Sequence, residues 1–266
     1  MDNAASEKSI IALDSWLQTP AGVYVRAWEQ SLLDALTADI FGYNAVQIGM
    51  PQIDALAANR MPSKWLADTR PRPRAGNTAA ARQVAVTFDY AELPFASQSL
   101  DLVVLPHVLE FAAEPHQVLR EVERVLIPEG QVIICGFNPR SLWGLSHLTG
   151  RVTGSHFLPP AGEFISMPRM KDWLKLLNMG ATHSHFGCYA PACRTEQWLQ
   201  RYVFMDRAGP RWWPYLGAVY MVQAIKRVKG MRLIGPAWKK SAKAPVAVPV
   251  TNRTSSTNRK QERQDG

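Results

Sequence analysis

Cysteine is scarce in this chain, which has Cys135, Cys188 and Cys193 among 266 residues. Three cysteines do not suggest a disulfide framework, and Cys135 lies inside an apolar run typical of a buried strand. Long apolar runs are also missing, since none approaches the roughly 18 residues needed to cross a bilayer. The first residues include Asp2 and Glu7 and lack the basic and apolar regions of a signal peptide. These absences favour a globular protein of the reducing cytoplasm.

Acidic residues are fewer than basic ones, and the basic excess is concentrated at one end. The formal net charge is +8, from 30 Lys and Arg against 22 Asp and Glu. Residues 237–266 hold seven Lys and Arg and two acids, which is +5 of that charge. The segment has few large apolar residues, so we expect a disordered tail. Its charge fits weak, salt-sensitive contact with nucleic acid or an anionic surface, or simple solubilisation.

The central segment reads as strand, strand, helix and strand with short connections. Val84–Phe88 is a short apolar run followed by Asp89, and Leu100–Leu105 is a second run of strand length. A helix should begin at Pro115, because apolar residues then recur at helical spacing until Pro128 and Gly130. The run Gln131–Phe137 supplies a third buried strand. This order predicts an α/β sheet with ligands at the carboxyl ends of its strands.

The residues of this segment carry a family resemblance. The text FDYAELPFASQSLDLVVLPHVLEF, followed by VLREVERVLIPEGQVII, resembles the middle of a class I S-adenosylmethionine-dependent methyltransferase. The matching parts are Asp89, residues 91–95, 100–104, 107–111 and 124–130. A narrower resemblance, to proteobacterial methyltransferases, comes from WLQTPAGVYV and FNPRSLWGL. The resemblance implies a Rossmann-like α/β fold, with a mostly parallel sheet, an antiparallel last strand and helices on both faces.

The resemblance also implies a cofactor, S-adenosylmethionine, and residues that would hold it. Asp89 and the Tyr90 backbone would meet the adenine, Asp68 the ribose, and Gly49 the methionine moiety, while Leu105 and Pro106 would border the sulfonium. The family's glycine-rich loop reads VQIGMPQID here, with Gln47 in the place of an acid. Pro51 removes an amide donor, and Ile53 is expected to add bulk beside the methionine. The weakly strand-like text before Asp68 leaves a solvated loop acid as the alternative for that residue.

The chain before the basic tail is divided into two parts. Residues 1–43 form a helical cap, with a helix over Gly22–Phe41, and residues 44–236 form the methyltransferase-like domain. Within it, residues 138–167 make no regular element and are interpreted as a lid or substrate insertion. Beyond lies a helix over Met167–Gly180 and two antiparallel strands, and the aromatic connection between these strands is expected to be core rather than a partner or membrane surface. The candidate substrate residues are Asn138, Trp143, His147 and His156.

Chemistry is assigned to His107, as a general base or substrate contact, with helix capping or packing as the alternative. His183, His185, Cys188 and Cys193 offer zinc ligand types, but their spacing matches no established finger, so no metal is expected. The function predicted is methyl transfer from S-adenosylmethionine to a small molecule. A methyltransferase-fold protein that only binds or regulates is the alternative, and a nucleic-acid methyltransferase is a weaker one because the N-P-P-Y-like signature is replaced by Leu105–Val108 (LPHV).

Overall fold

The computed structural model describes residues 12–69, 85–88, 90, 92–153, 157–159 and 162–227. Asp89, His156 and the basic tail from residue 237 lie outside the described residues. A seven-stranded sheet organises residues up to 227, in the order β3-β2-β1-β4-β5-β7-β6. The strands are β1 (Asn44–Ile48), β2 (Ser63–Asp68), β3 (Val86–Thr87), β4 (Leu100–Pro106), β5 (Leu126–Phe137), β6 (Met179–Gly187) and β7 (Val219–Lys226).

Strand direction follows the predicted pattern. The pairs β1–β2, β2–β3, β1–β4 and β4–β5 are parallel. β7 is antiparallel to both of its neighbours, β5 and β6. The expected mostly parallel sheet with an antiparallel last strand is therefore confirmed. The carboxyl ends of β1, β2 and β4 consequently share one rim, where a ligand site is expected in such sheets.

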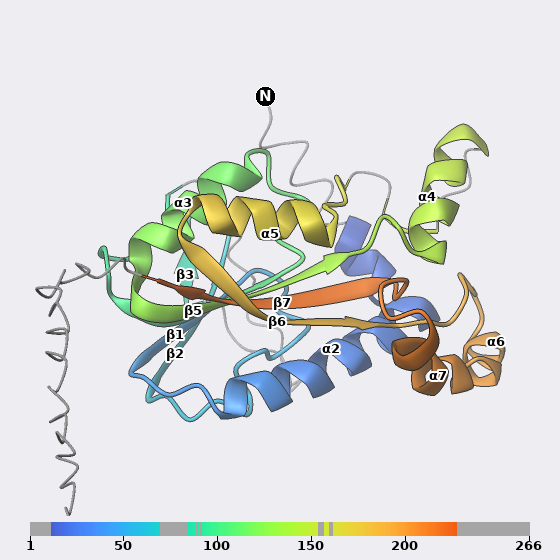
Figure 1. Ribbon diagram of the computed structural model, residues 1–266, viewed down its shortest axis with the longest axis horizontal. Helices are drawn as coiled ribbons and strands as arrows, with labels where there is room; N and C mark the ends of the chain where they lie inside the picture. The colour runs from blue at the N-terminus through green and yellow to red at the C-terminus, as the bar shows by residue number, and fades with distance from the viewer. Residues whose placement is uncertain are drawn as a thin grey trace, which may run out of the picture. The chain divides into compact units, whose positions relative to one another are not determined.

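Helices cover both faces of the sheet (Figure 1), with α2 on one face and α3 and α5 on the other. Because alternate residues of a strand point to opposite faces, each face has its own core. Leu102 and Val104 of β4 belong to one buried cluster, and Val103 and Leu105 to the other. The helices are α2 (Pro20–Ala38), α3 (Pro115–Val125), α4 (Leu142–Thr153), α5 (Met167–Leu176), α6 (Glu196–Arg201) and α7 (Phe204–Trp212).

Several predicted boundaries are corrected. The helix predicted over Gly22–Phe41 begins at Pro20, two residues before the predicted start, because the Thr19 side chain accepts a hydrogen bond from the Gly22 backbone N–H at 3.2 Å. β5 begins at Leu126, so Pro128 and Gly130 lie within the strand, whose pairing with β4 is irregular near Leu100. The weakly strand-like text before Asp68 is strand β2.

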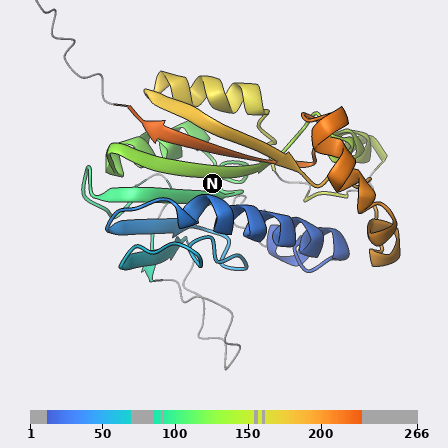
Figure 2. The ribbon, with the colours of Figure 1, turned by 60° about the horizontal axis from the view of Figure 1, so that its bottom comes forward.

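Two larger expectations about the second half of the chain are wrong. The segment 138–167 does contain a regular element, helix α4. The aromatic connection between β6 and β7 forms α6 and α7, and it leaves Trp198, Phe204 and Trp212 exposed instead of in the core. Figures 1 and 2 place α4, α6 and α7 at one end of the sheet.

Candidate functional site

A cleft that is partly open to solvent lies at the carboxyl ends of β1, β2 and β4. Residues from five stretches separated in sequence meet there, because the parallel strands end at the same rim. They are Leu13 and Asp14 before α2, Gly49–Pro51 after β1, Asp68 at the end of β2, Tyr90 after β3, and Pro106, His107, Val108 and Phe111 at and after β4.

The turn after β1 brings backbone to the cleft. Gly49 has φ +72° and Met50 φ +49°, both in the left-handed region that glycine tolerates best. The Gly49 N–H donates to the Ala67 carbonyl at 2.7 Å, which pins the turn to β2. A Cβ at position 49 would lie 3.0 Å from Val108 Cγ2 and 3.2 Å from the Tyr90 hydroxyl. Glycine is therefore required here by both conformation and space.

Gln47 holds the shape of the loop that follows. Its side chain is fully buried, and Nε2 lies 3.1, 3.0 and 2.8 Å from the carbonyl oxygens of Gly49, Met50 and Ile53. Its Oε1 accepts from the Ala55 backbone N–H at 2.9 Å. An acid could not replace these donated hydrogen bonds, because a carboxylate only accepts. The amide at position 47 therefore suits a loop that turns its carbonyl groups inward.

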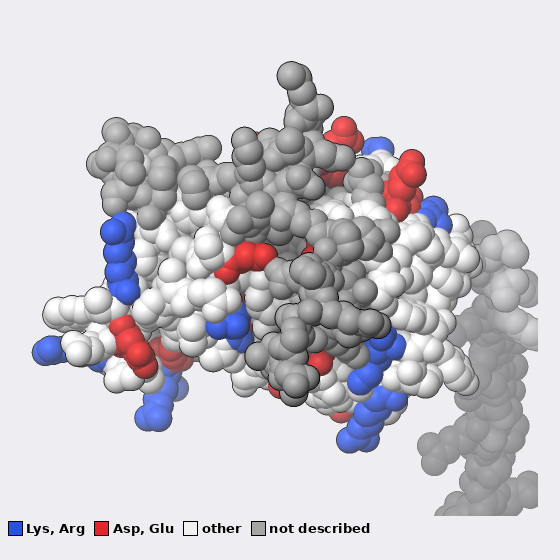
Figure 3. Space-filling view, turned by 180° about the vertical axis from the view of Figure 1, so that it is seen from behind, with Lys and Arg blue, Asp and Glu red and all other residues white. Residues whose placement is uncertain are grey.

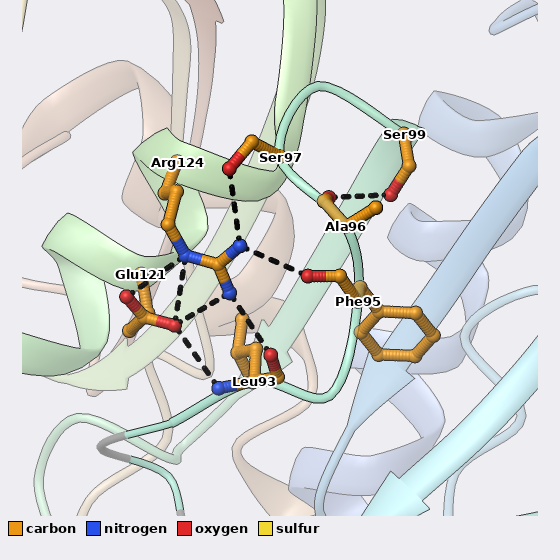
Figure 4. A network of polar contacts seen from close by, with 7 residues as sticks. All are labelled: Leu93, Phe95, Ala96, Ser97, Ser99, Glu121 and Arg124. Atoms are coloured by element: carbon orange, nitrogen blue, oxygen red, sulfur yellow. Dashed lines mark hydrogen bonds and ion pairs between the residues drawn. The ribbon is translucent and has the colours of Figure 1, made fainter.

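The loop beyond Tyr90 is fixed by a network around Arg124 of α3 (Figure 4). The Arg124 guanidinium donates to the carbonyls of Leu93 and Phe95, each at 2.9 Å, and pairs with Glu121 at 2.8 Å. Glu121 in turn accepts from the Leu93 N–H at 3.1 Å. Hydrogen bonds from Arg124 lower the pKa of Glu121 and keep this carboxylate charged. Arg124, which belongs to the matched range 124–130, therefore connects α3 to this loop.

Beneath the cleft, His107 lies between two glutamates. Its Nε2 is 2.7 Å from Glu29 Oε1 of α2, and its Nδ1 is 2.7 Å from Glu110 Oε2. All three side chains are buried. The other Glu110 oxygen accepts from the Phe137 N–H at 2.5 Å, whereas Glu29 Oε2 has no hydrogen-bond partner among the described residues.

Glu29, His107 and Glu110, which we call the triad, hold a proton on the His107 ring. Burial alone would lower the pKa of His107, but the neighbouring Glu29 and Glu110 carboxylates outweigh burial and raise it to about 10. Burial also raises the pKa of Glu110, against the opposing effect of His107. With both ring nitrogens donating, His107 is an imidazolium at neutral pH and has no lone pair with which to accept a proton. This geometry argues against the general-base role, and His107 instead joins α2 to the rim of β4.

Comparison with known proteins agrees with this geometry. A family model described as a methyltransferase domain matches residues 58–134. The uncharacterized protein YafS of Escherichia coli (strain K12) is 31% identical over 185 residues, which are 69% of this chain and 72% of that protein. This chain belongs to the class I S-adenosylmethionine-dependent methyltransferases. The family inferred from the motifs around Asp89 is thus confirmed.

Solved structures share the methyltransferase fold at low sequence identity. A Haloferax volcanii protein in complex with the Trm112 methyltransferase activator has a TM-score of 0.57 at 16% identity, over 82% of this chain and 96% of that chain. An S-adenosylmethionine-dependent methyltransferase from Thermotoga maritima has a TM-score of 0.53 at 15% identity, over 77% and 92% of the two chains. These likenesses establish the fold.

The fold brings most of the predicted cofactor residues to one place. Gly49, Asp68, Tyr90 and Pro106 all line the cleft. Asp68 is 5% exposed and accepts from the Thr69 N–H at 2.8 Å and the Tyr90 hydroxyl at 3.3 Å, so the alternative of a solvated loop acid is wrong.

Gln47 and Leu105 lie behind the lining. Gln47 binds loop backbone, and Leu105 is fully buried in the core cluster that contains Val103. The expected obstruction by Ile53 is also wrong, because this side chain packs in the core cluster of the other face and only Pro51 of the two lines the cleft.

The predicted substrate residues are placed differently. The amide of Asn138 donates to the carbonyls of Tyr215 and Gly217 at 2.8 and 2.9 Å, and the Trp143 indole donates to the Ala190 carbonyl at 2.7 Å. His147 packs on Phe164, with ring centroids 4.6 Å apart. These three residues lie outside the cleft lining and connect α4 to the body, and His156 is outside the described residues.

The histidine and cysteine cluster shows no metal-ligand arrangement. His183 and His185 stack on β6 with ring centroids 6.5 Å apart, and burial raises the pKa of the Cys188 thiol well above its usual value. Within the ranges that the structure describes, no group of three or more His, Cys, Asp or Glu side chains is arranged to hold a metal ion. In the same ranges, no helix has the length and apolar character required to cross a membrane.

Proposed function

We propose that this protein transfers a methyl group from S-adenosylmethionine to a small-molecule acceptor. The observation that carries the proposal is the meeting of Gly49, Asp68, Tyr90 and Pro106 in one cleft, at the rim where a parallel sheet of this kind binds its ligand. Family membership supports the same cofactor. The proposal is that the protein is an enzyme, that its acceptor is a small molecule and that it acts in the cytoplasm.

The residues of the cleft fit the cofactor. Asp68 is buried at the end of β2, where its carboxylate would accept hydrogen bonds from the ribose hydroxyls. Gly49 lets backbone approach the methionine moiety without a Cβ, and Ile53, packed in the core, leaves that side open. Tyr90 would border the adenine together with Asp89, and Pro106 would border the sulfonium.

The cofactor when bound supplies a methyl group already activated by the sulfonium, so the protein has to align an acceptor and exclude water. Leu13 and Phe111 contribute apolar surface to the cleft that would keep water out. The Asp14 and Asp68 side chains also line it, and their negative charge would favour a cationic ligand. We assign the role of general base to none of these residues.

Calorimetric titration of the full chain with S-adenosylmethionine and with its demethylated product tests the proposal. We expect binding of both, and Asp68→Asn should weaken it by about tenfold to a hundredfold, because hydrogen bonds to a charged group are lost. Asp172→Asn, the same substitution on exposed α5, should leave affinity unchanged. Absence of binding at millimolar ligand would sink the proposal.

A binding or regulatory protein without methyl transfer is the second candidate. Two observations favour it: Pro51 lacks an amide donor in the loop, and both ring nitrogens of His107 are engaged by Glu29 and Glu110. The two candidates differ in turnover. Release of demethylated cofactor on addition of candidate acceptors supports the enzyme, whereas tight cofactor binding without release over an acceptor panel favours the regulatory protein.

A further inference from the structure

Large apolar side chains gather at one end of the described structure. The connection between β6 and β7 exposes seven of them, which we call the aromatic face: Trp198, Val203, Phe204, Trp212, Trp213, Tyr215 and Leu216. Trp212 is 74% exposed and Tyr215 72%. α4, at the same end of the sheet (Figures 1 and 2), adds Leu142, Leu145 and Leu148, also exposed. Exposed apolar groups gathered in this way mark a surface that meets a partner.

The aromatic face is not what holds its helices to the body. Gly209 of α7 packs directly on the Tyr189 ring, since a Cβ there would lie 2.3 Å from it. Asp206 accepts from the Tyr24 hydroxyl at 2.5 Å and from the Tyr189 N–H at 2.9 Å. Leu199 is the buried residue of α6. Small and polar residues thus anchor α7, and the exposed surface of Trp198, Phe204 and Trp212 remains available to a partner.

The charge around the aromatic face is positive. Arg194, Arg201, Arg207 and Arg211 are exposed on or beside α6 and α7. Of the two acids in this stretch, Asp206 is engaged with Tyr24, which leaves Glu196 as the exposed one. The Arg201 guanidinium lies 5.6 Å from the Trp198 ring centroid. Figure 3, which views the molecule from behind, shows blue side chains and fewer red ones bordering a white surface at this end, on the left.

We propose that the aromatic face docks this protein on an anionic lipid surface. Tryptophan and tyrosine favour the headgroup region, where the ring is apolar and its N–H or O–H stays hydrated. Arginines beside them would pair with lipid phosphates, and apolar residues on short helices would enter the acyl boundary. A second copy would meet these charges less well, because its own aromatic face carries the same arginines and like charges repel.

Docking would place the cleft beside the lipid surface. α4 follows the carboxyl end of β5, and the aromatic face follows that of β6, which runs in the same direction. Both therefore leave the sheet at the rim that carries Gly49 and Asp68. The docking inference does not depend on methyl transfer, since it concerns binding of the protein alone.

Flotation of the full chain with vesicles tests the inference. Vesicles of phosphatidylcholine mixed with phosphatidylglycerol should carry the protein, and vesicles of phosphatidylcholine alone should carry far less. The double variant Phe204→Ser/Trp212→Ser should weaken partition by about tenfold or more, because two rings no longer insert. Arg207→Gln/Arg211→Gln should weaken it by a similar factor on anionic vesicles only. Leu176→Ser, which changes a 79% exposed side chain on α5, is the matched control.

The basic tail offers a competing explanation that a full-length variant separates. Lys239→Gln/Lys240→Gln/Lys243→Gln should retain most of the binding if the aromatic face carries it. Binding that depends on these lysines and ignores Phe204→Ser/Trp212→Ser would overturn the inference. Failure of the unmodified chain to float with the vesicles would also overturn the inference. A third contradicting result would be light scattering that shows a dimer of the unmodified chain and a monomer of Phe204→Ser/Trp212→Ser.

Discussion

His107 Nε2 lies 2.7 Å from Glu29 Oε1, although 78 positions separate the two residues and both side chains are buried. Glu110 completes the arrangement on the opposite ring nitrogen. Burying charges is costly, and a buried ion pair becomes a liability when one partner is removed. The triad therefore links helix α2 to the rim of β4 beside the cleft. We expect its loss to lower the free energy of unfolding more than it affects the reaction.

Replacing His107 by glutamine should lower the free energy of unfolding by about 3–5 kcal/mol, because two buried carboxylates lose their cation. Urea unfolding at neutral pH measures the change. His183→Gln, an exposed histidine on β6, should cost little. Removing all three charges together, as Glu29→Gln/His107→Leu/Glu110→Gln, should cost less than His107→Gln alone. A single variant as stable as the parent would contradict a charged triad.

The same triad predicts a pH dependence. The pKa of His107 is near 6.5 in the unfolded chain and about 10 in the folded protein. Between these values the folded state binds a proton that the unfolded state lacks, so stability falls as pH rises. The contribution is complete below pH 6.5 and lost above pH 10. The slope reaches at most about 1.4 kcal/mol per pH unit.

Unfolding of the parent and of His107→Gln across this pH window isolates the effect. The difference between their free energies of unfolding should shrink as pH rises through the window. Carbon-13 shifts of the His107 ring should show both nitrogens protonated at neutral pH. Parallel stability curves for the two proteins would refute the raised pKa.

The variant Gln47→Glu restores the acid that the family has at this position, and it tests whether that acid raises or lowers stability and cofactor binding. The structure predicts harm, because a carboxylate would face the carbonyl oxygens of Gly49, Met50 and Ile53 and donate to none. The loss should be about 3 kcal/mol of stability, with weaker cofactor binding. The exposed Gln98→Glu is the matched control. Tighter binding by Gln47→Glu would mean that the loop adopts another shape with ligand.

Sequence patterns predicted the parts of this protein that depend on local periodicity. The runs that became β1, β4 and β5 are contiguous and apolar because both faces of each strand are buried. The hydrogen bonds of Gln47 have no local sequence signal, since they are made to loop carbonyls that turn inward only in the folded chain. Glu29 has no local signal, because a glutamate in a helix looks like a solvent-facing residue until a distant histidine meets it.

The second half was harder to predict for a different reason. Glycines and prolines in residues 138–167 suggested an irregular lid, but Gly144 belongs to α4, where a Cβ would lie 2.3 Å from the Pro139 carbonyl oxygen. Glycine there serves close packing and does not break the helix. The density of aromatic residues in α6 and α7 is typical of a core, but Gly209 and Asp206 anchor α7 and leave its aromatic side chains exposed.

Gly49→Ala tests the turn on which the cleft depends. Alanine at φ +72° is strained, and its Cβ would press on Val108 Cγ2 at 3.0 Å. We expect a loss of about 1–2 kcal/mol in the free energy of unfolding and about tenfold in cofactor affinity. Adding Val108→Ala removes the contact but leaves the backbone strain, so the double variant should recover only part of the stability. Full recovery would assign the cost to crowding alone, and an unchanged Gly49→Ala protein would show that the turn is not needed in this conformation.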